Sequence, residues 1–551
     1  MRLRPRSPRD LAAIFLLVLS LVVFGLQLRS LYTVPVFDAA RWGGDETWLM
    51  REFVHQAEHG ALIYPESFGE PVRTNGVLAG SMWGNALIYG VSGIIFFPQF
   101  DYVSIGRTVT AILALLLIGS LYFISRRIGV SPFLSASAVA VMVLSKGFVL
   151  AAHSARYDLL TGLVLIWYCY YLSKIEVAGM RQTFIAGALG IFTICFSPHL
   201  LTLSAGASLA FLIGIRMWQK PSKLSAWIVG TAAGIAVLSV SYMVGSGEFS
   251  LFGRGGKAGI FSFVLNEIPI LRPFSRNVQL SNITERFQLL LTDLPEMLFA
   301  VGISMALLVT YYLRRRRNLE RGIAFDITFS KSQRFFLYSA FLCTLLWLLT
   351  EGSRPYYLFH IAPMLLMACG IIVERSFKTF SRQQLVELGC FIFMSFVIIF
   401  GLNHAIPDSK FGEFISHDQQ SAVTTFLQEV RNTSQQKSRI LFDVAGLDRA
   451  LMDTSTQVLT LDMFQPPPNA ELLVNKLRSN NIDYIVLRSS PAGTAFEPGR
   501  ALIPHVLDSI GVIQDSMLGF FYDDGRSYGA SIGELRKQGL DTLRLYRLRK
   551  N

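Results

Sequence analysis

The sequence predicts an all-α polytopic membrane bundle of about 11 transmembrane helices, with interfacial helices in the first outer loop and a small C-terminal α/β domain. Three observations predict it. Of the 551 residues, 52% are hydrophobic and 16% charged, whereas a soluble domain has about a quarter charged residues. Apolar runs long enough to cross a bilayer recur along the chain. The Lys and Arg residues that give the net charge of +12 lie in short clusters between these runs, which argues against a nucleic-acid partner.

The basic clusters predict which ends of the helices face the cytoplasm, because cytoplasmic loops collect Lys and Arg. The clusters are Arg2 to Arg9, Arg126-Arg127, Lys174 to Arg181, Arg216 to Lys223, Arg314 to Arg317 and Arg375 to Arg382. The first span, Leu11 to Leu28, has no A-x-A cleavage site and is expected to stay uncleaved. The other spans are expected near residues 104–125, 132–150, 159–173, 183–196, 200–215, 224–244, 288–313, 335–350, 356–373 and 385–402. Residues 1–403 thus form the predicted transmembrane domain.

One apolar segment, Val77 to Phe97, is excluded from the spans because counting it would place every later basic cluster outside. It is interrupted by four glycines and contains Trp83 and Tyr89, which favour the headgroup level. We therefore expect interfacial helices within a first outer loop of about residues 32–102.

The polar C-terminal part, residues 404–551, is expected to be an α/β domain on the outer (periplasmic) side. Arg439 to Asp443 and Tyr484 to Leu487 have strand patterns, and Ala470 to Leu477 has a helix pattern.

Three carboxylates are the candidate acid–base groups. Asp45 and Glu46 precede an amphipathic stretch with Leu49, Met50, Phe53, Val54 and Ala57 on one face. Asp158 follows His153-Ser154-Ala155-Arg156-Tyr157 at the outer end of a span. Asp45 has an alternative role as a helix N-cap, and a charge at a membrane boundary is often merely solvated. However, the topology places all three carboxylates on one side of the membrane, which suits base chemistry on an acceptor.

These motifs resemble those of the GT-C membrane glycosyltransferases, particularly the protein O-mannosyltransferases, the lipid A aminoarabinose transferases and bacterial lipopolysaccharide transferases. The resemblance covers roughly residues 1–400 and rests on the order of short motifs. They are Gly44-Asp45-Glu46, Gly69-Glu70-Pro71, Ile105-Gly106-Arg107, Arg126-Arg127-Ile128-Gly129, Arg156-Tyr157-Asp158 and Arg354-Pro355-Tyr356-Tyr357 before Ile361-Ala362-Pro363. It implies a GT-C fold and inverting transfer of a sugar from a polyprenyl-phosphate donor, with Asp45 as the general base.

The resemblance also implies cations around the donor phosphate, since they stabilise the charge of the leaving group. Arg73 stands where many relatives have a Lys-Pro-Pro, so the chain departs from the family there. The other candidates are Arg254, Lys257, Arg272, Arg276 and Arg354, with Arg156, Tyr356 and Tyr357 as supporting residues. The alternative for each loop cation is contact with anionic headgroups.

No metal site is assigned, although a divalent ion is compatible with the family. His55 and His59 have a possible ligand spacing but lack the Glu of a metalloprotease motif. The five cysteines have no CxxC spacing.

Two other functions compete with sugar transfer. A transporter or flippase would carry charges or broken helices at the bilayer midplane, or repeated halves, and the predicted spans are largely free of Asp and Glu. A non-catalytic subunit of glycan assembly is the other. The expected location is the bacterial inner membrane with the active site facing the periplasm, and the acceptor (lipid, glycan or protein) and the sugar stay open.

Overall fold

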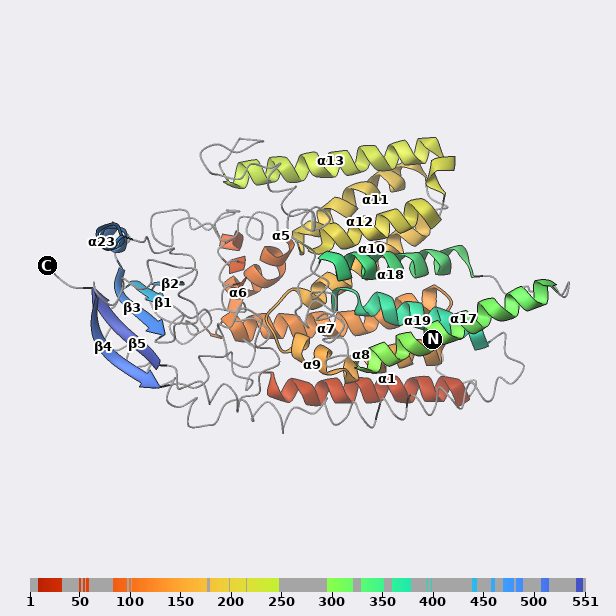
Figure 1. Cartoon of the computed structure of the whole chain (residues 1–551), viewed down its shortest axis with the longest axis horizontal. Coiled ribbons are helices and arrows are strands. Elements are labelled where there is room, and N and C mark those ends of the chain that lie inside the picture. Colours follow the sequence, from red (N-terminus) through yellow and green to blue (C-terminus); the bar gives the residue numbers. More distant parts are fainter. Residues whose placement is uncertain are drawn as a thin grey trace. The chain divides into compact units, whose positions relative to one another are not determined.

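The computed structural model contains a helical bundle and a mixed β-sheet (Figure 1). It describes residues 8–31, 49–50, 53–54, 56–58, 83–96, 99–100, 102–175, 179–197, 199–214, 216–246, 295–320, 329–350, 359–377, 394, 398, 439–442, 457–460, 469–479, 482–488, 507–514 and 542–548. The internal contacts divide the chain into two units. The first comprises Met1–Leu31, Thr110–His153 and Tyr157–Pro407; the second comprises Tyr32–Val109, Ser154–Arg156 and Asp408–Asn551.

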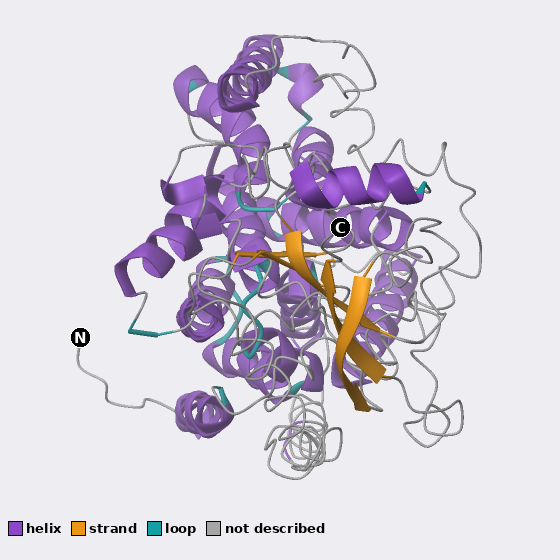
Figure 2. Ribbon diagram, turned by 90° about the vertical axis from the view of Figure 1, so that its left-hand side faces the viewer, coloured by secondary structure: helices purple, strands orange, loops and turns teal. Residues whose placement is uncertain are grey.

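The first unit is a bundle of long helices whose axes run in nearly one direction (Figure 1), and several of them are seen end-on in Figure 2. Its helices are α1 (Pro8–Gln27), most of α7 (Tyr102–Arg127), α8 (Pro132–Leu144), α9 (Lys146–Ala152), α10 (Asp158–Lys174), α11 (Met180–Phe192), α12 (His199–Gly214), α13 (Pro221–Ser246), α17 (Pro295–Glu320), α18 (Lys331–Thr350) and α19 (Ala362–Phe377). Within the described residues, three stretches are long and apolar enough to cross a membrane: Asp10–Gln27, Ser104–Arg127 and Pro221–Leu238. Shorter apolar helices accompany them.

The helices follow most of the predicted spans, with differences that have local causes. The span expected at 132–150 is broken into α8 and α9 at Ser145, whose hydroxyl donates to the carbonyl of Met142 and accepts from the amide of Phe148. This side chain satisfies one backbone group at the end of α8 and one at the start of α9. The span expected at 385–402 lies almost entirely outside the described residues.

At one end of the bundle, Gln333 of α18 links three elements. Its amide nitrogen donates to the carbonyl of Ile128, in the turn between α7 and α8, at 3.1 Å. Its amide oxygen accepts from Nε and Nη2 of Arg375, near the end of α19, at 2.9 and 2.7 Å. In the same region, the Glu374 carboxylate accepts from the amide of Ser131, the residue that caps α8. The two bonds to Gln333 hold the guanidinium of Arg375 in a defined position.

In the second unit, the described residues of the predicted amphipathic stretch, 49–50, 53–54 and 56–58, are helical. Leu49, Met50, Phe53 and Val54 are all buried. A second helical stretch consists of α5 (Trp83–Asn85), the π-helix η2 (Ala86–Gly90) and α6 (Val91–Phe96), with 3, 5 and 6 residues. Such a length is too short to cross about 30 Å of hydrocarbon. A side chain at position 90 would have its Cβ 2.0 Å from the carbonyl oxygen of Phe53, so Gly90 is what allows the two helices to touch.

The same unit contains a five-stranded sheet with the order β2-β1-β3-β5-β4. The strands are β1 (Arg439–Phe442), β2 (Gln457–Thr460), β3 (Ile482–Arg488), β4 (Leu507–Gln514) and β5 (Thr542–Leu548). β2, β1 and β3 are parallel, whereas β5 is antiparallel to both β3 and β4. Helix α23 (Ala470–Ser479) connects β2 to β3 and buries Leu473 and Leu477. The predicted strands at 439–443 and 484–487 and the helix at 470–477 are confirmed, and a separate domain over 404–551 stays a prediction.

Candidate functional site

Asp158 begins helix α10 and is 1% exposed. A carboxylate in the first turn is favoured by the positive end of the helix dipole, which is a structural reason for an acid at this position. Burial is not part of that reason, since a capping or dipole-stabilising acid acts equally well at the surface. An ionisable side chain is rarely fully buried unless it is paired, so its partner decides what it does.

The partner is His360, which lies in the turn before α19, 202 residues away in the sequence. The Nε2 of His360 donates to Oδ1 of Asp158 at 2.9 Å, and the side chains are 0% and 1% exposed. Because a carboxylate accepts hydrogen bonds, this bond places a proton on Nε2 of His360. A carboxylate that orients an imidazole is a recurring arrangement in acid–base sites, and it also occurs as a purely structural pair.

A close backbone approach brings His360 to Asp158. A Cβ on Gly162, one turn along α10 from Asp158, would lie 2.3 Å from the carbonyl oxygen of Phe359 and 3.5 Å from Cγ of Pro363. The ring of Phe359 packs edge-on against Phe148 of α9, with centroids 5.9 Å apart. The glycine therefore sets the distance between α10 and the segment that carries His360.

We expect Gly162→Ala to lower the free energy of unfolding by about 1–3 kcal/mol, because the backbone of Phe359 has to move away. The displaced segment carries His360, so activity should fall as well. Thermal unfolding of the detergent-purified protein measures the first effect. The matched control is Gly119→Ala in α7, where a Cβ meets nothing within 4 Å, and there a helical alanine should be neutral or stabilising. Equal stability of both variants would contradict the close contact.

Two further rings with polar groups, those of His199 and Tyr157, lie next to the Asp158–His360 pair. The ring of His199, the first residue of α12, lies 4.8 Å from the ring of His360 and 6.3 Å from that of Tyr157, on which it stacks. Tyr157, His199, His360 and Asp158 thus form a row of ionisable groups, and all except His199 are buried. The row can hold a proton and can orient a carboxylate. We refer to these four residues as the Asp158 cluster.

In the second unit, Arg156 and Arg107 are buried arginines, 2% and 0% exposed. The hydroxyl of Tyr89 donates to the carbonyl of Arg156 at 2.8 Å, and the Tyr89 ring packs on Phe53 with centroids 5.7 Å apart. The backbone of Arg156 is therefore held by Tyr89, in the second helical stretch of the first predicted loop.

Of the predicted site residues, Asp158 and Arg156 lie in the described part of the chain. Asp45, Glu46, Arg73, Arg254, Lys257, Arg272, Arg276, Arg354, Tyr356 and Tyr357 lie outside it. The sequence analysis missed His360 and His199. The signal for His360 was a histidine beside the Ile361-Ala362-Pro363 motif at the start of an apolar helix, since ionisable residues in such positions are often functional. The described residues include no group of three or more His, Cys, Asp and Glu side chains placed to hold a metal ion.

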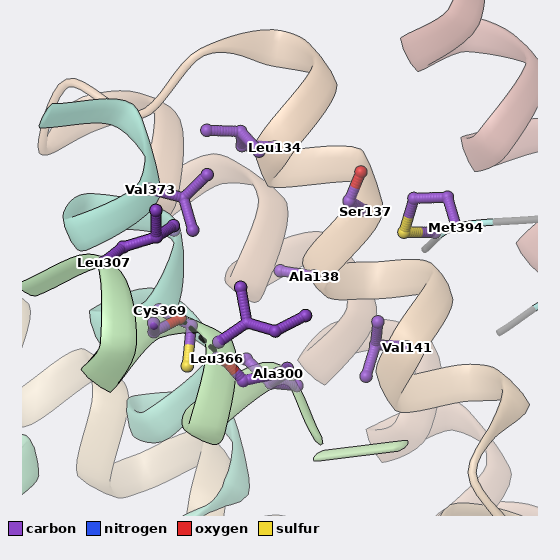
Figure 3. Close-up of a pocket in the computed structure, with 13 residues that line it drawn as sticks. Leu134, Ser137, Ala138, Val141, Ala300, Leu307, Leu366, Cys369, Val373 and Met394 are labelled. Carbon is purple, nitrogen blue, oxygen red and sulfur yellow. Dashed lines mark hydrogen bonds between the residues drawn. The ribbon is translucent and has the colours of Figure 1, made fainter. Parts of the chain in front are cut away.

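A cavity of about 240 Å³ lies elsewhere in the bundle, between α8, α17 and α19 (Figure 3). Its described lining is almost wholly apolar, including Leu134, Val141, Leu366 and Val373, with Ser137 as one of few polar side chains. Such a lining suits hydrocarbon and offers no acid–base pair. The chemistry of the side chains therefore identifies the Asp158 cluster as the candidate site.

No family model matches the sequence, and no curated protein is significantly similar to it. The structure, in contrast, is similar to the crystal structure of ArnT from Cupriavidus metallidurans bound to undecaprenyl phosphate, with a TM-score of 0.56 over 90% of this chain and 96% of ArnT. This chain has the GT-C fold. The apo structure of ArnT gives a TM-score of 0.51 over 90% of this chain and 95% of ArnT. Sequence identity is 12% in both comparisons, so the similarity concerns the fold. The GT-C fold predicted from the short motifs is confirmed.

Proposed function

We propose that this protein is a membrane glycosyltransferase that moves a sugar from a polyprenyl-phosphate donor to an acceptor hydroxyl, with inversion, on the periplasmic face of the inner membrane. The observation that carries the proposal is the fold shared with ArnT, whose structure holds undecaprenyl phosphate, over nearly the full length of both chains. The Asp158 cluster, which is buried except for His199, adds acid–base groups to that fold. Lipopolysaccharide or another cell-surface glycan is the proposed setting.

In the proposed reaction, the carboxylate of Asp45 takes the proton from the acceptor hydroxyl. The acceptor oxygen forms a bond to the anomeric carbon, the bond from that carbon to the phosphate oxygen breaks, and polyprenyl phosphate leaves with the electron pair. The leaving phosphate gains charge, which nearby cations stabilise more in the transition state than in the ground state. Arg354 is the proposed main contact because its fork matches a phosphate, with Arg73, Arg254, Lys257, Arg272 and Arg276 as further candidates.

Asp158 and Glu46 are proposed to shape the acceptor side of the site. For Asp158, the support is its bond to His360, which limits the carboxylate to one orientation. A preorganised carboxylate holds a hydroxyl without having to reorganise during the reaction. His360 is in this view a positioning residue.

Mass spectrometry of membrane lipids and surface glycans, with and without the gene, tests the proposal. A glycosyltransferase predicts that one sugar is lost from one acceptor, while its polyprenyl-linked form accumulates. Purified protein should then transfer that sugar from the isolated polyprenyl-linked donor in detergent. A transporter or flippase would instead require a sealed membrane, so transfer in detergent separates the two functions. A purified protein that does not transfer the accumulated sugar would contradict the proposal.

A further inference from the structure

A groove of about 860 Å³ runs between α17, α18 and α19, on the first unit. Apolar side chains from all three helices line its length, among them Leu308, Leu348, Leu365 and Ile372. Large apolar side chains at its rim are strongly exposed, for example Met305 at 53% and Phe341 at 66%. In a bilayer, such a rim faces the hydrocarbon chains of lipids.

One end of the groove is basic, and each of the three helices contributes an arginine there. Arg334 of α18 is exposed and itself lines the groove. Arg316 of α17 is exposed and follows the lining residue Tyr312 by four positions, which places it on the same helix face. Arg375 of α19 follows the lining residue Ile372 by three positions, and its guanidinium is bonded to Gln333, next to Arg334.

Glu374 of α19 is an acid at this end, and its carboxylate accepts from the amide of Ser131. Within the described lining of the groove, Arg334 is the one charged side chain. Basic residues beside a membrane attract anionic headgroups by about 1 kcal/mol each. Cytoplasmic loops collect Lys and Arg in membrane proteins generally, but Arg334 also lines the groove itself, where a headgroup phosphate can reach it.

The distribution of charge along the groove also distinguishes it from the proposed donor site. The described lining away from Arg334 offers only uncharged groups, such as Ser304 and Thr344. The donor phosphate needs cations where transfer occurs. The cations proposed for that role lie in predicted outer loops, whereas the basic clusters are predicted to lie on the cytoplasmic side. A donor bound here with its phosphate at Arg334 would have its sugar–phosphate bond at the cytoplasmic end of the groove, whereas the proposed transfer occurs on the periplasmic face.

We propose that this groove binds one anionic phospholipid of the cytoplasmic leaflet, with its phosphate at Arg334 and an acyl chain along the apolar wall. Arg316 and Arg375 add to the positive potential at the headgroup. The lipid packs against α17 and α18 along the groove that they line together. This site is independent of the proposed sugar transfer.

Native mass spectrometry of the full-length protein in mild detergent tests the site, using phosphatidylglycerol, phosphatidylethanolamine and undecaprenyl phosphate as separate probes. Wild type should retain one phosphatidylglycerol under conditions that remove phosphatidylethanolamine. Arg334→Gln should bind phosphatidylglycerol about fivefold more weakly, the loss of one cation–headgroup attraction. The matched control is Arg181→Gln, which removes an equally exposed arginine on α11, outside the described lining of the groove, and it should bind like wild type.

A second variant addresses the acyl chain. Ala368 lines the groove and is 8% exposed, so Ala368→Phe should fill the wall and lower retention of phosphatidylglycerol while Arg334 is intact. If that variant does not fold, the comparison of Arg334→Gln with Arg181→Gln still tests whether phosphatidylglycerol binding depends on Arg334. Equal binding by these two variants overturns the proposal. So does equal retention of phosphatidylethanolamine, or an Arg334-dependent preference for undecaprenyl phosphate.

Discussion

An Asp45→Asn protein is expected to transfer sugar about 10²–10⁴-fold more slowly than wild type, the usual contribution of a positioned general base. Asparagine keeps the size of aspartate and is an equally good N-cap, so a role limited to capping predicts nearly full activity. The substitution thus separates the two roles of Asp45. The rate is measured under single-turnover conditions with saturating polyprenyl-linked donor, so that chemistry and not product release is observed.

The matched control for this experiment is Asp38→Asn, an acid in the same predicted loop with no assigned role. It should transfer sugar at the wild-type rate. Donor binding by Asp45→Asn should be unchanged, because the base acts on the acceptor. An Asp45→Asn protein that folds normally and retains activity within a few-fold of wild type would contradict the role of Asp45 as the general base. Asp158 would then become the leading candidate for the base.

Removing one partner of the Asp158–His360 pair should have the second largest effect. His360→Leu leaves the buried carboxylate without its imidazole, and breaking a buried pair in this way costs about 3–5 kcal/mol. His360→Gln, which can still donate an N–H to Asp158, should recover part of the loss. Thermal or denaturant unfolding in detergent measures the stability of each variant.

The double variant Asp158→Leu/His360→Leu separates stability from function. Replacing both partners by apolar side chains of similar size should restore most of the stability lost in His360→Leu, because no buried polar group is left from the pair. Transfer activity should stay low if Asp158 shapes the acceptor site. A double variant that is both stable and active would show that the pair is only a structural contact.

The sequence by itself determined the class of the protein and much of its local structure. Helices α1, α7 and α13 are visible as apolar length, because an isolated helix in lipid has to satisfy its own backbone and cover it with apolar side chains. The buried face of residues 49–54 and strands β1 and β3 follow from periodicity, which is a property of neighbouring residues. The order of short motifs was sufficient for the GT-C fold.

Only the tertiary structure decided which distant side chains meet. No periodicity relates Asp158 to His360, because they are 202 positions apart in the sequence and the contact of Gly162 with Phe359 brings them together. The bonds of Gln333 to Ile128 and Arg375 and the sheet order β2-β1-β3-β5-β4 likewise depend on partners far along the chain. The physical reason is that hydropathy and spacing report the environment that a residue needs, whereas packing of particular helices selects which residue provides it.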